Sequence, residues 1–265
     1  MKFQICRTLI YLLTLLCLSS AFSLALGQRI KHSVANAHSH NDYNHAKPFY
    51  TAYDSGFGSI EADIFLRNGH LYVAHDFADI DTARTLAALY LEPLREKIVK
   101  NNGHVYPDAL KKLQLLIDLK TAALPTLDTL ISVLRKYNEI IECPTLKIVI
   151  SGNQPDHSRL NAYPRWIHFD GRPGKIPAPE VLDRIALISD NFRKYSSWTG
   201  EGTLPRPDLK KIKLVVAEAH KYKKPIRFWA TPDSPDAWRL LKKLKVDYIN
   251  TDKIGELSDF LNLYK

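Results

Sequence analysis

From residue 33 onward, short runs of apolar and β-branched residues alternate with longer amphipathic stretches. The runs that predict strands are 33–37, 59–66, 71–74, 113–119, 146–150, 166–169, 185–188, 226–230 and 248–250. The stretches that predict helices are 48–55, 85–100, 126–137, 208–222, 236–244 and 254–263. Strands that alternate with helices favour a parallel sheet, and about eight such units are typical of a (β/α)₈ barrel.

One pair of strands departs from this alternation. Asn68-Gly69, a hairpin turn sequence, separates the strand over 59–66 from the strand over 71–74. No internal repeat or linker divides the remainder of the chain. We therefore predict one α/β domain over 28–265, a TIM-type (β/α)₈ barrel with a small hairpin insertion after strand two.

Polar residues gather where the predicted strands end. In a barrel of this type, the carboxyl ends of the strands converge on one mouth. His38 follows the first strand, Glu61 and Asp63 lie on the second, and His75 follows its hairpin partner. The later strands carry or precede Asp118, Lys120, Asn153, Asp190, Trp229 and Asp252. The sequence therefore predicts a single site at this mouth.

The first 27 residues have a different pattern. Lys2 and Arg7 precede an apolar run over 9–18, and small residues follow up to Gly27. This order is typical of a secretory signal peptide, so we predict cleavage of residues 1–27 and export to the periplasm or the extracellular space. The alternative is a retained transmembrane anchor, but the apolar run is short for a bilayer span of ~20 residues.

Cysteine content and charge fit an exported protein with an anionic ligand. Cys143 has no partner for an internal disulfide once the predicted signal peptide is removed. That peptide holds two basic residues and no acid, so the formal net charge falls from +9 to +7. A basic surface suits anionic small molecules or peripheral contact with an anionic membrane. The lysines are spread over helix faces without a nucleic-acid-binding motif, so we predict no nucleic-acid partner and expect a monomer.

The polar strand ends indicate metal-assisted chemistry. Glu61 and Asp63 are two residues apart on a strand and therefore point to the same side. With Asp118 they would offer three carboxylates to one divalent ion, and hard oxygen ligands suit Mg²⁺ or Ca²⁺. His38 and His75 would serve as acid and base, since imidazole titrates near neutral pH. Lys120 would then hold a phosphate oxygen.

Five segments carry a resemblance to a known family. They are 37–38, 58–63, 69–76, 116–120 and 246–252. Through them, nearly the whole of 28–265 resembles the glycerophosphodiester phosphodiesterase and phosphatidylinositol phospholipase C-like superfamily. The chain is most similar to the branch called altered inheritance of mitochondria protein 6-like.

The resemblance implies a barrel that hydrolyses phosphodiesters with Mg²⁺ or Ca²⁺ and two histidines. It implies that His38 and His75 are the catalytic pair and that Glu61, Asp63 and Asp118 are the metal ligands. The expected substrate is a glycerophosphodiester or a phospholipid-like headgroup. One histidine would take a proton from water or a substrate hydroxyl and the other would protonate the leaving oxygen, with their order left open.

The chain departs from the family at one motif. The usual His-Arg-Gly after strand one is His38-Ser39-His40-Asn41 here. We expect His40 or Asn41 to take the place of the arginine that contacts phosphate. We also expect Trp229 to form a wall of the substrate site.

Two other functions are compatible with these residues. The His38-x-His40 pair also resembles the start of multinuclear, His-rich metal-dependent phosphoesterases or amidohydrolases. These enzymes require further histidines at later strand ends, where this chain has acids and amides. The third hypothesis is a non-catalytic barrel that binds an anionic ligand.

Overall fold

The chain folds into a closed barrel of parallel strands. The computed structural model describes residues 32–175 and 178–263, and the predicted signal peptide over 1–27 lies outside them. Eight parallel strands pair in the order β1-β9-β8-β7-β6-β5-β4-β2, and pairing of β1 with β2 closes the barrel. β3 runs antiparallel to β2. The predicted (β/α)₈ barrel with a hairpin after strand two is confirmed.

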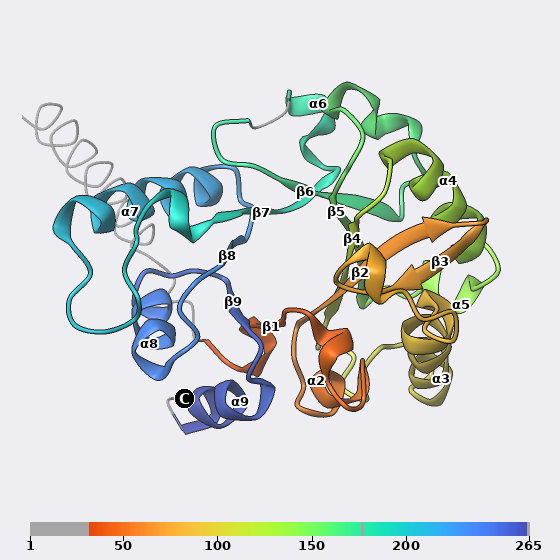
Figure 1. Cartoon of the computed structure of the whole chain (residues 1–265), viewed down its shortest axis with the longest axis horizontal. Coiled ribbons are helices and arrows are strands. Elements are labelled where there is room, and N and C mark those ends of the chain that lie inside the picture. Colours follow the sequence, from red (N-terminus) through yellow and green to blue (C-terminus); the bar gives the residue numbers. More distant parts are fainter. Residues whose placement is uncertain (1–31, 176–177, 264–265) are drawn as a thin grey trace, which may run out of the picture. The chain divides into compact units, whose positions relative to one another are not determined.

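Helices cover the outside of the strands (Figure 1). The strands are β1 (Ala37–Ser39), β2 (Ser59–Arg67), β3 (His70–Val73), β4 (Leu113–Leu119), β5 (Leu146–Gly152), β6 (Ile167–Gly171), β7 (Ile185–Asn191), β8 (Ile226–Trp229) and β9 (Tyr248–Thr251). The α-helices are α2 (Tyr50–Asp54), α3 (Glu92–Lys100), α4 (Ala123–Leu134), α5 (Asn138–Ile141), α6 (Pro179–Leu182), α7 (Arg206–Lys221), α8 (Pro235–Lys243) and α9 (Ile254–Leu263). Within the described residues, no helix is long and apolar enough to cross a membrane.

The hairpin turn follows the chemistry of its two residues. Asn68 and Gly69 have φ angles of 52° and 79°, the positive values that a two-residue hairpin turn requires. β3 then returns along β2, with Val73 opposite Ile64. This return brings His75 back beside Asp63, in the middle of β2.

The first strand begins later than the sequence predicts. The segment Val34–Asn36 forms a 3₁₀ turn, and β1 starts at Ala37. The side chain of Asn36 accepts from the backbone of Ser33 at 3.0 Å and donates to the carbonyl of Asp247 at 2.9 Å. These bonds hold the segment in a turn, although Val34 and Ala35 fit a strand. The prediction of a strand over 33–37 is therefore wrong, and β1 ends at Ser39.

Apolar side chains fill the space on both sides of the barrel wall. The main core packs the outward faces of the strands against the helices. A second, smaller cluster contains Leu116 and Val149, two residues before Asp118 and Ser151 on their strands. Because alternate residues of a strand share a face, this cluster lies on the inward face below the mouth. The polar residues at the mouth therefore lie above a buried apolar layer.

Candidate functional site

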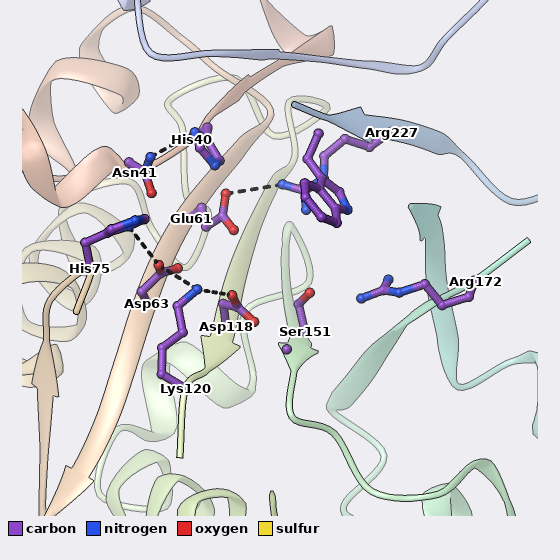
Figure 2. Close-up of a pocket in the computed structure, with 12 residues that line it drawn as sticks. His40, Asn41, Glu61, Asp63, His75, Asp118, Lys120, Ser151, Arg172 and Arg227 are labelled. Carbon is purple, nitrogen blue, oxygen red and sulfur yellow. Dashed lines mark hydrogen bonds and ion pairs between the residues drawn. The ribbon is translucent and has the colours of Figure 1, made fainter. Parts of the chain in front are cut away.

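A cavity of about 310 Å³ opens at the carboxyl ends of the strands (Figure 2). Eight of the nine predicted site residues line it: His40, Asn41, Glu61, Asp63, His75, Asp118, Lys120 and Trp229. The ninth, His38, does not line the cavity. Four residues that the sequence analysis did not select also line it: Ser151, Gly152, Arg172 and Arg227.

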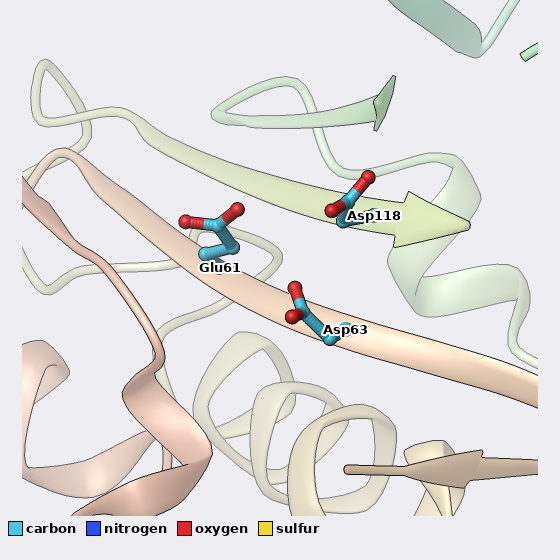
Figure 3. A group of neighbouring side chains, drawn as sticks. All are labelled: Glu61, Asp63 and Asp118. Carbon is cyan, nitrogen blue, oxygen red and sulfur yellow. The ribbon is translucent and has the colours of Figure 1, made fainter. Parts of the chain in front are cut away.

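Three carboxylates form an acidic cluster on one wall, consisting of Glu61, Asp63 and Asp118 (Figure 3). Glu61 and Asp63 share the inward face of β2, and Asp118 on β4 lies beside Asp63 in register. One oxygen from each residue lies within 4.8 Å of the others. Among the described residues, this is the one group of three or more acids, histidines or cysteines with metal-site geometry.

The hydrogen bonds of the acidic cluster leave room for a cation. Lys120 Nζ lies 2.6 Å from Asp118 Oδ2 and 2.9 Å from Asp63 Oδ2. The other oxygen, Oδ1, of each aspartate is buried and has no hydrogen-bond partner within the described residues. Buried unpaired carboxylate oxygens are costly, and hard cations satisfy them. The acidic cluster therefore fits one Mg²⁺ or Ca²⁺ ion.

The electrostatics of the acidic cluster agree with this fit. Burial raises the pKa of Asp63 to about 6, and the charge of Glu61 adds to the increase. For Glu61, burial alone would raise the pKa, but the charge of Arg227 and the contact with His38 outweigh it and hold the pKa below its usual range. Glu61 is thus ionised at neutral pH, and Asp63 carries a charge that nearby cations only partly compensate.

His38 lies beneath the cavity, in the interior of the barrel. Its side chain is 0% exposed, with Nδ1 2.7 Å from Ser59 Oγ and Nε2 2.9 Å from Glu61 Oε2. Burial and the charge of Arg227 lower its pKa to about 4, so the ring is neutral at physiological pH. The structure places His38 against the back of a carboxylate of the acidic cluster and away from the cavity surface. This position follows from the later start of β1.

His40 occupies the position at the mouth that the sequence analysis gave to His38. Its backbone N–H donates to the carbonyl of Thr251, so it lies directly beyond β1. Nδ1 lies 2.8 Å from Asp252 Oδ1, and the side chain is 28% exposed. Burial alone would lower its pKa, but the hydrogen bond to Asp252 and the charges of Glu61 and Asp252 raise it above the usual value.

His75 lies on the same side of the rim as His40 and Asn41 (Figure 2), and hydrogen bonds through Asn41 and Tyr43 connect the two histidines. Its Nδ1 is 3.1 Å from the hydroxyl of Tyr43 and 3.9 Å from Asp63 Oδ2. Tyr43 donates to Asn41 Oδ1 and lies 2.8 Å from Asp63 Oδ2. Asn41 Nδ2 in turn lies 3.0 Å from His40 Nδ1. Tyr43, which the sequence analysis did not select, therefore links Asn41 to His75 at the rim.

Two arginines that the sequence analysis missed supply positive charge. Arg227 on β8 lies 3.2 Å from Glu61 Oε2 and also contacts His38 Nε2. Arg172 follows β6 and pairs with the buried Asp170. The signal for Arg227 was an arginine inside a buried strand, two residues before Trp229. Arg172 was missed because the predicted strand ended at Phe169, whereas β6 continues to Gly171.

The remaining polar strand ends have structural contacts. Asp190 accepts from Lys194 and Tyr195 and does not line the cavity. Asn153 donates to the backbone carbonyls of Lys120 and Thr121. Both residues therefore stabilise loops beside the mouth.

Two models of known protein families match this chain. The model of the AIM6-like phosphodiesterase domain matches residues 29–142. The model of the glycerophosphoryl diester phosphodiesterase family matches residues 225–255. These matches cover the strands that carry the acidic cluster and the last two strands of the barrel.

Two relatives of this chain are similar to it in sequence over most of its length. Altered inheritance of mitochondria protein 6 from Kluyveromyces lactis is 30% identical over 86% of this chain and 72% of its own length. Its homolog from Arthroderma benhamiae is 28% identical over 82% of this chain and 81% of its own length.

Among solved structures, a glycerophosphodiester phosphodiesterase from Parabacteroides distasonis has a TM-score of 0.52 at 15% identity, covering 86% of this chain and 94% of that one. One from Agrobacterium tumefaciens has a TM-score of 0.50 at 15% identity, covering 84% and 97%. At this identity the structural matches establish the barrel fold. The family follows from the sequence relatives: the chain belongs to the altered inheritance of mitochondria protein 6-like branch of the glycerophosphodiester phosphodiesterase superfamily.

Proposed function

We propose that this protein is a metal-dependent phosphodiesterase that hydrolyses a glycerophosphodiester or a phospholipid-like substrate. The observation that carries the proposal is the acidic cluster, whose two aspartates each have a buried, unpaired Oδ1 and which lines the same cavity as His40 and His75. Family membership and the phosphodiesterase barrel support the reaction class.

The acidic cluster would hold one Mg²⁺ or Ca²⁺ ion. When bound, such an ion polarises a phosphoryl oxygen and stabilises negative charge in the transition state. Lys120, fixed between Asp63 and Asp118, presents its ammonium to the same space and can contact a second phosphate oxygen. Arg227 and His38 keep Glu61 ionised and correctly placed.

The catalytic pair that we propose is His40 and His75, in place of His38 and His75. General acid–base catalysis requires a group within reach of the substrate, and His38 is fully buried below the cavity. The raised pKa of His40 favours its protonated form, which suits donation of a proton to the leaving oxygen. His75 would then take the proton from water or from a substrate hydroxyl, and a substrate hydroxyl would give a cyclic phosphate first.

The test is a panel of phosphodiesters with Mg²⁺, Ca²⁺ or a chelator, read by which product carries the phosphate. We expect turnover with a cation and its loss with the chelator. The panel should include a p-nitrophenyl diester, because this leaving group departs without a proton donor. His40→Ala should lose roughly 10²–10⁴-fold on alkyl diesters and much less on the p-nitrophenyl diester. His75→Ala should lose activity on both.

Other outcomes would reject the proposal. Binding of diesters without turnover under every cation would favour a non-catalytic barrel. Bound Zn²⁺ or Mn²⁺ in a multinuclear site would favour the His-rich hydrolase. The single His-free cluster among the described residues argues against that alternative.

We further propose that the protein acts after export, on a small molecule or a lipid headgroup and as a monomer. The pattern of residues 1–27 and the basic net charge support export and contact with an anionic membrane.

A further inference from the structure

The part of the cavity wall that follows β6 presents a positively charged side chain that the proposed hydrolysis does not use. Arg172 follows β6, and its side chain reaches toward the centre of the cavity (Figure 2). Asp118 lies on β4, two strands away around the barrel. Neighbouring strands are ~4.8 Å apart, so the two backbone positions are separated by roughly 10 Å.

Arg172 differs from Arg227 and Lys120 in the acid with which it forms an ion pair. Within the described residues, Lys120 and Arg227 both contact members of the acidic cluster. The partner of Arg172 is Asp170, which is 0% exposed and does not line the cavity. The positive charge therefore faces the cavity while the compensating charge lies behind it.

Buried groups hold the guanidinium in this position. Nη1 contacts Asp170 Oδ2, Ser189 Oγ at 3.0 Å and the carbonyl of Gly171 at 3.1 Å. Asp170 also accepts from the hydroxyls of Ser151 and Ser189. All hydrogen bonds that the described residues make to this guanidinium use Nη1. Its Nη2 and Nε donors remain for a ligand.

We propose that Arg172 forms a second anion subsite, which binds a carboxylate or a phosphate on the headgroup of the diester. The planar guanidinium recognises either group in a fork-like arrangement and is preorganised here by Asp170. The preferred substrates are then diesters whose alcohol part carries a further negative charge. This inference rests on the proposed function, because the diester phosphate must occupy the acidic cluster for the headgroup to reach Arg172.

Two matched pairs of ligands test the subsite. Glycerophosphoserine differs from glycerophosphoethanolamine by one carboxylate, and glycerophosphoinositol 4-phosphate differs from glycerophosphoinositol by one phosphate. Affinities are measured by calorimetry with Ca²⁺ on the full chain carrying His40→Ala and His75→Ala, so that the cation is present and binding is read without turnover. Ratios of kcat/KM are measured in parallel with Ca²⁺ or Mg²⁺. The pair with the larger preference identifies which anion the subsite takes.

Three variants define the role of the side chain. Wild-type protein should prefer the anionic member of at least one pair by roughly tenfold to a hundredfold, the range for a charge-assisted hydrogen bond. Arg172→Gln should abolish this preference. Arg172→Lys keeps a counter-charge for Asp170 but lacks the fork, so the preference should fall while the melting temperature stays close to wild type. Arg135→Gln removes an exposed positive charge directly after α4 and should leave the preference unchanged.

The outcomes separate this inference from the proposed function. Equal affinity within both pairs, no binding of any ligand, or a preference that survives Arg172→Gln overturns the subsite. A preference for glycerophosphoethanolamine over glycerophosphoserine, with none for the 4-phosphate in the other pair, also overturns it and would point to Trp229 as the headgroup contact. Loss of turnover in every arm rejects the phosphodiesterase, whereas the affinity ratios still decide the subsite.

Discussion

At the scale of single residues, two histidines that are two positions apart have opposite environments. His38 is buried and contacts Ser59 and Glu61, whereas His40 is 28% exposed at the cavity rim and contacts Asp252. The alternation of strand residues places both rings on the inward face. His38 holds Glu61 of the acidic cluster in place, whereas His40, the next residue along this face, can reach a substrate.

We predict that His38→Ala will mainly lower stability, whereas His40→Ala will mainly lower kcat. His38→Ala leaves a cavity and removes one of the two partners of Glu61 Oε2, so it should lower the free energy of unfolding by about 2–4 kcal/mol and weaken cation binding. His40→Ala should change that free energy by less than about 1 kcal/mol and reduce kcat on alkyl diesters. Denaturant unfolding and steady-state kinetics measure the two effects. A stable His38→Ala protein that has lost only kcat would restore His38 as a catalytic residue.

At the scale of elements, the carboxyl end of β5 supports Asp118, the member of the acidic cluster that lies on β4. Gly152 has a φ angle of 71°, and a Cβ added there would lie 1.9 Å from Asp118 Oδ1 and 2.6 Å from the carbonyl of Leu119. The lack of a side chain therefore allows Asp118 to hold its position. Gly69 in the hairpin turn has a similar φ of 79°, but a Cβ there would meet nothing within 4 Å.

These two glycines provide a matched pair of alanine variants. Gly69→Ala should cost about 1–2 kcal/mol of stability, the cost of a left-handed backbone, and leave cation binding intact. Gly152→Ala has the same backbone cost and also displaces Asp118, so it should weaken Ca²⁺ affinity at least tenfold. Calorimetric titration and thermal unfolding of both variants measure the difference. Equal Ca²⁺ affinity in the two variants would show that Asp118 is not a ligand.

Element boundaries were predictable where local pattern and tertiary contacts agree. The buried run over 113–119 was predicted as a strand and is β4 without change. The first strand was misplaced because side chains of Ser33 and Asn36, the latter bound to Asp247, outweigh the β-branched pattern. Helix α4 begins at Ala123, three residues before the predicted start of this helix at Thr126. The side chain of Thr126 bonds back to the carbonyl of Ala122 instead.

At the scale of the whole molecule, barrel closure concentrates charge in a small interior space. Eight strands bring Glu61, Asp63 and Asp118 together with Lys120 and Arg227 above an apolar floor. The pKa of Asp63, raised to about 6, reflects this crowding. The metal-free folded chain binds that proton more tightly than the unfolded chain, so ionisation of Asp63 destabilises it as the pH rises from about 4 to about 6.

We predict that Ca²⁺ or Mg²⁺ will stabilise the metal-free protein more at pH 7.5 than at pH 5. A bound cation removes the cost of ionised Asp63, but at pH 5 it must first displace a proton, which weakens its affinity by about tenfold. A concentration of 100 times the Kd should add about 2.7 kcal/mol at pH 7.5. Thermal unfolding at both pH values measures this, with Na⁺ at equal ionic strength as control. An equal shift at both pH values would contradict the role of Asp63.

The sequence by itself determined the barrel, the hairpin and the acidic cluster, because these follow from local periodicity and from strand ends that must meet at one mouth. It also determined the family, through motifs that are local in the chain. Tertiary structure decided which histidine reaches the cavity and which arginines face it. His38 and Arg227 are 189 residues apart in sequence, and their contact depends on the register of strands that pair only when the barrel closes. The carboxyl end of β1 lies only two residues beyond the predicted one, at Ser39, but this shift places His40 at the mouth and leaves His38 buried below it.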